Sequence, residues 1–126
     1  MNSDVLKSRT KRFALSIIEL SGMLPNNRVG WTFTNQIVRS ATSIAANYRA
    51  VCRAKSDKDF IAKMETVIEE ADETKFWLEM IDESNVLCDK VEEIRRLDNE
   101  ANELVSIFVS SVKTVKRRLE SGSEKS

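Results

Sequence analysis

The 126-residue sequence contains no histidine, one proline, three glycines and two cysteines. Without histidine it lacks the Glu-x-x-His pairs of di-iron bundles, the Ser-His-Asp triad and the usual zinc sites. It also lacks a glycine-rich phosphate loop. We therefore predict that the protein is not an enzyme and binds no metal or cofactor. A bound metal found by elemental analysis would reopen the catalytic alternative.

Long apolar runs are missing too. None approaches the ~20 residues of a membrane span, and residues 1–12 have no apolar core of signal-peptide type. We expect a cytoplasmic protein with no membrane partner, and two cysteines suit that reducing compartment. Cys52 and Cys88 are expected at opposite ends of a long helix, too far apart for a disulfide, so we interpret both as structural thiols.

Apolar residues recur at helical steps of three and four along four segments. The first helix is expected over residues 4–21 with Ser3 as N-cap, and Gly22 and Pro25 end it. A loop over residues 26–30 follows, and Trp31 and Phe33 then close the top of the core. The second helix starts at residue 31 or 34 and ends at residue 53, and its candidate N-caps are Thr32, Thr34 and Asn35.

The third helix is expected over residues 57–83 with Ser56 as its N-cap, and the fourth starts near Asp89 with Glu92 in a capping-box arrangement. No strand pattern is present. Four helices with short connections predict an all-α, up-down-up-down antiparallel four-helix bundle over residues 1–120. A disordered polar tail is expected over residues 121–126.

Residues 39–47, Arg-Ser-Ala-Thr-Ser-Ile-Ala-Ala-Asn, carry two stripes at helical spacing. One is apolar and predicted to face the core. The other is small or polar, so a neighbouring backbone can come close there. We expect Arg39, Ser40, Ser43 and Asn47 to act in packing or assembly, and Asn47 to be buried and hydrogen-bonded so that it fixes register.

Charge is unevenly distributed although the net charge is zero. Residues 1–56 carry nine Lys/Arg and two Asp/Glu, whereas residues 57–110 carry six Lys/Arg and sixteen Asp/Glu. Folded as a bundle, the chain collects cations at one pole, and such clusters attract polyanions. The candidate nucleic-acid residues are Lys11, Arg12, Arg49, Arg53, Lys55, Lys116, Arg117 and Arg118. No aromatic residue interleaves with them, so backbone contact is expected rather than base stacking.

Carboxylates along residues 57–83 are interpreted mainly as a solvated face. Glu70, Glu73 and Trp77 share a face, and we expect them at an interface where the carboxylates pair with arginine. Apolar residues outside the main stripes, such as Leu15 and Phe76, exceed what one four-helix core obviously absorbs. Such a surplus indicates self-association.

Three stretches also carry a family resemblance: residues 36–47 with the pattern Arg-Ser-x-x-Ser-Ile-x-x-Asn, residues 58–61, and residues 69–78. They resemble the bacterial four-helix-bundle proteins first noticed inside intervening sequences of 23S ribosomal RNA genes. The resemblance implies a homopentameric, barrel-like assembly. It also implies a relation to the accessory protein of diversity-generating retroelements, which binds nucleic acid and a reverse transcriptase.

Two functions remain open at this point. The first is a non-catalytic homo-oligomeric scaffold, a pentamer by the resemblance, whose basic pole binds RNA or DNA. The alternative is a protein–protein interaction module without nucleic-acid binding, whose partner would be a neighbouring protein such as a reverse transcriptase.

Overall fold

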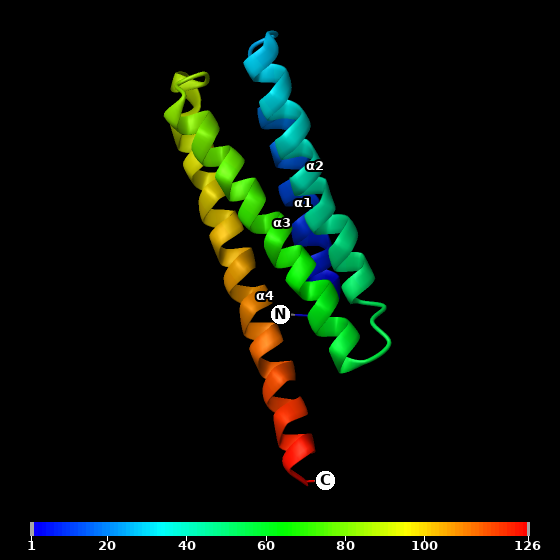
Figure 1. Ribbon diagram of the computed structural model, residues 1–126. Helices are drawn as coiled ribbons and strands as arrows, with labels where there is room; N and C mark the ends of the chain where they lie inside the picture. Colours follow the sequence, from blue (N-terminus) through cyan, green and yellow to red (C-terminus); the bar gives the residue numbers. More distant parts are fainter. Residues whose placement is uncertain (1, 126) are drawn as a thin grey trace.

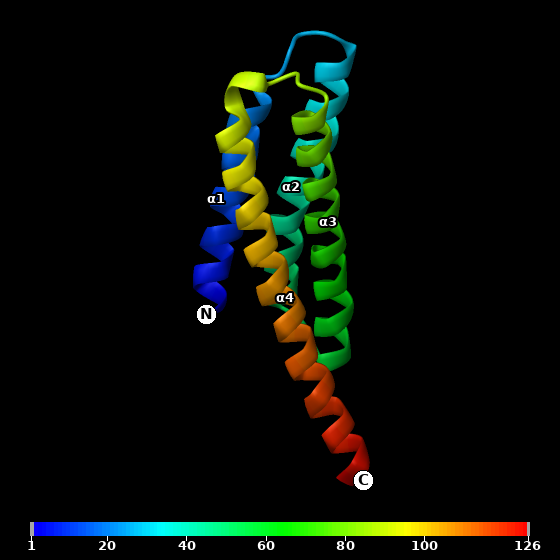
Figure 2. The ribbon, with the colours of Figure 1, turned by 90° about the vertical axis from the view of Figure 1, so that its left-hand side faces the viewer.

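The computed structural model describes residues 2–125, with side-chain burial described for residues 2–122. Its elements are α1 (Ser3–Ser21), α2 (Arg28–Val51), α3 (Asp57–Glu83), a short 3₁₀ turn η1 (Cys88–Lys90) and α4 (Val91–Lys125). Successive helices run in opposite directions (Figures 1 and 2), and no strand occurs in the described chain. The predicted all-α antiparallel four-helix bundle is therefore confirmed.

The bundle is asymmetric. Most contacts between helices join α1 to α2, α2 to α3 and α3 to α4, and fewer join α1 to α4. In Figure 2, α1 and α3 stand on opposite sides with α4 in front, and the end of α4 projects beyond the other helices. The outer surfaces of α1 and α3 consequently face in opposite directions, while both helices run the same way along the bundle.

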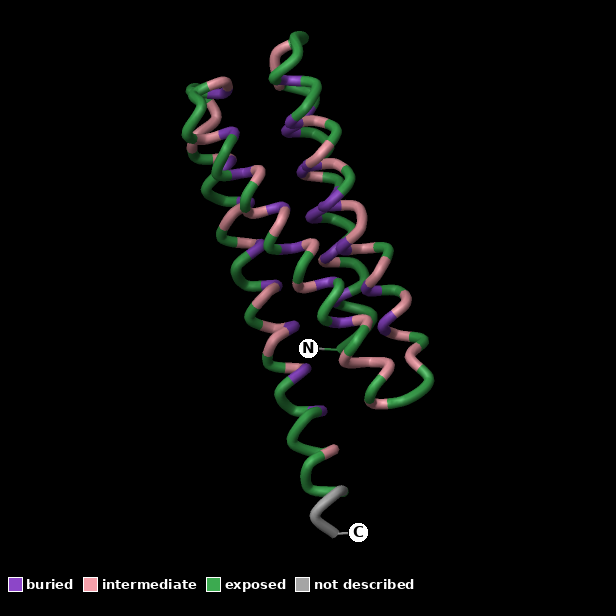
Figure 3. The backbone as a smooth tube through the Cα atoms, in the orientation of Figure 1, coloured by how far each residue is buried: buried purple, intermediate pink, exposed green. Residues whose placement is uncertain are grey.

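The core follows the predicted stripes. On α3, the residues spaced by four and three are buried from Met64 to Ile81, and only Phe60 at the start of the stripe is partly exposed. Buried positions lie mainly on the sides of the helices that face one another (Figure 3). Three hydroxyl-bearing residues are fully buried with the apolar ones, namely Thr10, Ser40 and Thr74. Ile18 lies outside the buried stripe of α1 and is 43% exposed.

Two helix starts differ from the prediction. Asn2, rather than Ser3, caps α1, since its Oδ1 accepts a hydrogen bond of 2.9 Å from the Val5 N–H. In the same way, Asn27 caps α2 by accepting from the Gly30 N–H at 3.0 Å. The helix therefore begins at Arg28, inside the expected loop. The side chain of asparagine accepts a hydrogen bond from a free N–H group in the first turn of a helix, which is why asparagine is the N-cap at both positions.

The other corrections concern helix contents and ends. The candidate caps Thr32, Thr34 and Asn35 all lie within α2, which ends at Val51. Trp31 is 54% exposed and donates from Nε1 to Asn26 Oδ1, so it does not close the core, whereas Phe33 is buried. The predicted Ser56 cap and the bounds of α3 are confirmed, since Ser56 Oγ accepts from the Asp59 N–H.

At the other end of the chain, a 3₁₀ turn over Cys88–Lys90 precedes α4. The helix itself starts at Val91, so the expected start at Asp89 with a Glu92 capping box is wrong. Helical backbone continues to Lys125, past residue 121, where the sequence predicts a disordered tail. Gly122 is the one weak helix former among the residues there and costs only about 1 kcal/mol relative to Ala. Ser126 lies outside the described residues.

Candidate functional site

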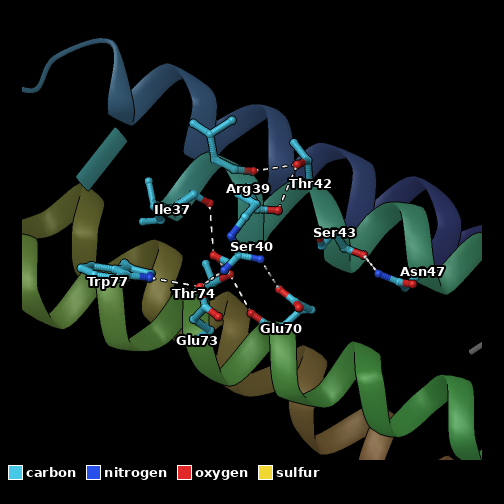
Figure 4. Close-up of polar contacts among 11 residues, drawn as sticks. Ile37, Arg39, Ser40, Thr42, Ser43, Asn47, Glu70, Glu73, Thr74 and Trp77 are labelled. Carbon is cyan, nitrogen blue, oxygen red and sulfur yellow. Dashed lines mark hydrogen bonds and ion pairs between the residues drawn. The ribbon is translucent and has the colours of Figure 1, made fainter. Parts of the chain in front are cut away.

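The stretch Arg39 to Asn47 packs against α3 through a pair of buried hydroxyls (Figure 4). Ser40 Oγ and Thr74 Oγ1 lie 2.8 Å apart, and both side chains are fully buried. Thr74 Oγ1 is also 2.9 Å from the Glu70 carbonyl oxygen, and Ser40 Oγ is 3.3 Å from that of Ile37. One hydroxyl therefore donates to the other and the accepting one donates to its own helix. The small Ser40 side chain is compatible with this close contact of α2 and α3.

Beside this pair, Arg39 forms ion pairs with two carboxylates of α3. Its guanidinium lies 3.3 Å from Glu70 and also contacts Glu73, whose carboxylate accepts from Trp77 Nε1 at 3.3 Å. The ring of Trp77 in turn packs against Phe33 of α2. The structure thus pairs Glu70 and Glu73 with an arginine of the same chain. A role of these residues between chains stays a prediction.

Asn47 differs from its prediction. It is half-buried, and its Nδ2 donates to the Ser43 carbonyl oxygen one turn earlier at 2.9 Å. That bond stays within α2, so Asn47 does not set the register against another helix. From this stretch, Ser40 and Arg39 form the hydrogen bonds that reach α3. Ser43 is half-buried on the same side of α2.

The start of α1, the end of α2, the start of α3 and a late part of α4 meet at the pole where cations were expected. A cleft of about 410 Å³ is lined by Ser3 of α1, Cys52 after α2, Asp57 of α3 and Arg118 of α4. The predicted juxtaposition of these ends is therefore present. Cys88 follows α3, at the opposite end of that 27-residue helix from Asp57, so the expected separation of the two cysteines holds.

Several cations at this pole are neutralised by carboxylates. Arg118 lies 2.9 Å from Asp57, and Lys116 lies 3.6 Å from Glu65. These two were candidates for nucleic-acid binding. The backbone N–H of Lys55 donates to the carboxylate of Asp59. Hydrogen bonds from Lys63 and from Lys55 lower the pKa of the Asp59 carboxyl. Paired cations have less positive charge to offer a polyanion.

Arg9 is the most enclosed of the paired cations. It bridges α1 to α4 through a bidentate contact with Glu100, at 2.7 and 2.8 Å, and a further contact with Glu103. The hydrogen bond from Arg9 holds the pKa of Glu100 below its ordinary value. The same bond raises the pKa of Arg9. Arg9 therefore serves to hold α1 against α4, where the helices otherwise make fewer contacts.

A second group of cations has no such neutralisation. Lys7 and Lys11 of α1 and Arg49 of α2 line a groove of about 550 Å³ with the small residues Ser8, Ala45 and Ala46. We call this set the basic groove. None of its described lining residues is a carboxylate, and none of its three cations forms an ion pair with a described residue. Arg12, Arg53 and Arg117 also lack such a pair, but they lie outside the groove.

Lys7 was not among the candidate binding residues predicted from sequence. The available signal was spacing, since Lys7 and Lys11 are one helical turn apart on α1. Their convergence with Arg49 depends on how α1 is rotated against α2. The residue pattern of a single helix does not reveal that rotation. Thr74, the partner of Ser40, was likewise not among the site residues predicted from sequence.

No helix of the described residues is long and apolar enough to cross a membrane. In that same part of the chain, no three His, Cys, Asp or Glu residues come together as a metal site would require.

The sequence matches the model of the 23S rRNA-intervening sequence protein family over residues 3–110. The chain belongs to that family. The resemblance identified from residues 36–78 is thereby confirmed. The basic groove lies inside the matched range, whereas Lys116, Arg117 and Arg118 follow it. Comparison with curated proteins finds no match.

A solved structure agrees with the family assignment. It is the 1.70 Å crystal structure of a protein with unknown function from the S23 ribosomal protein family of Bacteroides thetaiotaomicron VPI-5482. The two chains are 33% identical and superpose with a TM-score of 0.80, covering 90% of this chain and 99% of that one. The shared family fold is therefore an all-helical bundle, and the function of that relative is unknown.

Proposed function

We propose that this family member is a non-catalytic scaffold that self-associates and binds nucleic acid through the basic groove. The observation that carries the proposal is the groove itself, where Lys7, Lys11 and Arg49 converge and no described carboxylate lines the walls. Cations on two helices can contact successive phosphates. Small side chains between them leave space for a backbone to approach.

The groove favours recognition of the phosphate backbone over recognition of bases. Its described lining contains no aromatic residue on which a base could stack. Neutralising three phosphates of a duplex gives a slope of about −2.7 in the plot of log affinity against log salt concentration. A fourfold increase in salt then weakens binding about 40-fold. Sequence specificity is expected to be low.

The test is fluorescence anisotropy with labelled RNA and DNA at 50 and 200 mM salt, concentrations between which such contacts lose affinity. Replacing Lys7, Lys11 and Arg49 with Glu should abolish binding. The matched control replaces Lys75, Lys90 and Arg95 with Glu, which changes the net charge equally at positions on α3, η1 and α4 outside the groove. Unchanged binding by the groove variant, or equal loss in both variants, would refute a role for the groove.

Self-association is supported by large apolar side chains left on the surface of one copy. Leu15 is 56% exposed and Phe76 is 48% exposed, although both lie in long, well-packed helices. We propose the pentamer that the family resemblance implies. Light scattering at micromolar concentration should then give about five times the 14.4 kDa of one chain. A mass of one chain would refute it.

The alternative is a protein–protein interaction module, and the same exposed apolar residues favour it. Its partner would be a nucleic-acid-processing protein such as a reverse transcriptase. Two results together would support it over nucleic-acid binding: co-purification of a defined protein partner, and no anisotropy change with either RNA or DNA.

A further inference from the structure

Among the described residues of the basic groove, Ser8 has the one side chain that can both donate and accept a hydrogen bond. The lysine and arginine side chains around it only donate, and the two alanines do neither. Ser8 is exposed on α1, directly after Lys7 and one turn before Lys11. A ligand held by these cations therefore brings its neighbouring groups close to the Ser8 hydroxyl.

The Ser8 hydroxyl is not engaged within the described chain. By contrast, Thr10 and Thr42 of the same two helices donate to carbonyl oxygens one turn earlier, at 2.8 and 2.7 Å. Ser8 forms no hydrogen bond of this kind with any described residue. Both the donor and the acceptor of its hydroxyl are open to a ligand.

Double-stranded RNA carries the groups that this set of donors and acceptors matches. Proteins bind it mainly through its phosphates and through the ribose 2′-hydroxyl, which donates and accepts and is the group that distinguishes RNA from DNA. Recognition of single-stranded RNA instead uses aromatic side chains that stack on the bases. The described lining of the groove contains no aromatic residue.

We infer that the basic groove takes the backbone of double-stranded RNA, and that Ser8 distinguishes it from DNA by accepting a hydrogen bond from a 2′-hydroxyl. This inference rests on the proposed function and names the class of nucleic acid. Lys7, Lys11 and Arg49 contact the phosphates of either duplex, whereas Ser8 gains this partner only on RNA. One such hydrogen bond corresponds to a preference of about twofold to tenfold.

Asp4 borders this site and provides a second measurement. Its exposed side chain shares the adjoining hollow with Ser8 and Lys11, and it lies one turn before Ser8. A carboxylate repels the phosphates of both duplexes alike. Asp4→Ala should therefore strengthen the binding of RNA and DNA by the same factor, which separates the effect of charge from that of the Ser8 hydroxyl.

The experiment measures fluorescence anisotropy with labelled duplexes of one sequence, made of RNA, of DNA and of 2′-fluoro RNA, which keeps the A-form helix but has no 2′-hydroxyl. The wild type should bind the RNA duplex about twofold to tenfold more tightly than the other two. It should also bind that duplex more tightly than one of its RNA strands alone.

Ser8→Ala should bind all three duplexes alike, at the wild-type affinity for DNA. Its dependence on salt should be unchanged, because Ser8 carries no charge. The matched control is Ser16→Ala, the same change on α1 outside the groove, and it should keep the preference for RNA. Alanine is a better helix former than serine, so both variants should fold, and circular dichroism checks this.

The other outcomes separate this inference from the proposed function. Equal affinity of the wild type for the RNA and DNA duplexes overturns the inference alone. So does a Ser8→Ala variant that keeps the preference or weakens both duplexes equally, and so does a preference that Asp4→Ala removes. A 2′-fluoro duplex bound as tightly as RNA, or a single strand bound more tightly, has the same consequence. Binding of no nucleic acid overturns the proposed function, and this inference with it.

Discussion

The buried pair Ser40 and Thr74 allows a quantitative test of how α2 is held against α3. We consider Ser40→Ala, Thr74→Val and the two combined. Ser40→Ala removes one hydroxyl, and Thr74→Val replaces one hydroxyl with a methyl group in a side chain of the same shape. Because the two oxygens lie 2.8 Å apart with no exposure to water, a hydroxyl that loses its partner cannot turn to solvent.

The expected costs differ because the remaining acceptors differ. After Ser40→Ala, the Thr74 hydroxyl still donates to the Glu70 carbonyl oxygen at 2.9 Å, so the loss should be about 0.5–1 kcal/mol of unfolding free energy. After Thr74→Val, Ser40 keeps only the longer 3.3 Å contact with Ile37, and the loss should be about 1–2 kcal/mol. The double variant leaves no hydroxyl unpaired. It should cost about 1 kcal/mol less than the sum of the single losses.

The assay is urea unfolding followed by circular dichroism, at one fixed protomer concentration because assembly would add to apparent stability. The midpoint should shift while the denaturant dependence of the unfolding free energy stays unchanged. Losses that add within about 0.3 kcal/mol would refute the reasoning, because independent sites behave in that way. An equal loss in both single variants would contradict the assigned acceptors.

Two further outcomes follow from the contacts. Gly30→Ala should destabilise the fold by about 1–3 kcal/mol, because a Cβ there would lie 1.7 Å from the Pro25 carbonyl oxygen; Gly122→Ala, with nothing within 4 Å, is the thermal-melting control and should lose no stability. Arg9→Met should cost about 1 kcal/mol at neutral pH. The folded-state pKa of Glu100 is depressed, so its stabilisation is present above its ordinary 4.5 and lost as the pH falls through the lower folded value. The difference between wild type and Arg9→Met in urea unfolding should therefore shrink below about pH 4.5, and a constant difference would contradict this role.

Local sequence patterns predict both ends of α3 correctly but place the start of α2 wrongly. The structure shows the physical reason for this difference. On α3, the Ser56 cap, two aspartates in the first turn and an uninterrupted apolar stripe all agree. On α2, Gly30 suggests a loop when read in isolation. In the structure, its missing side chain makes room for the Pro25 carbonyl oxygen, so the loop folds back over a helix that has already begun. That is a tertiary contact, and periodicity carries no information about it.

The site shows the same division between local and tertiary information. The gathering of cations at one pole follows from helix order alone and was predictable. Which cations remain available was not, because Arg9 meets a carboxylate 91 residues away and Arg118 meets one 61 residues away. Such pairings depend on helix rotation and on how far α4 projects. The family resemblance located the packing stretch around Ser40, but it did not identify Thr74 as its partner.

Lys11 bears on both parts of the proposed function, and this decides which variants can separate them. It lines the basic groove and precedes the exposed Leu15 of α1 by one helical turn. Reversing its charge therefore changes the groove and the surroundings of Leu15 together. Arg49 lines the groove from α2, and Leu15 is not among the groove residues, so these two positions separate nucleic-acid binding from self-association. If copies associate, each adds another basic groove to the assembly, and a long nucleic acid would engage several at once. Weak affinity of one groove is therefore compatible with firm binding by the whole scaffold.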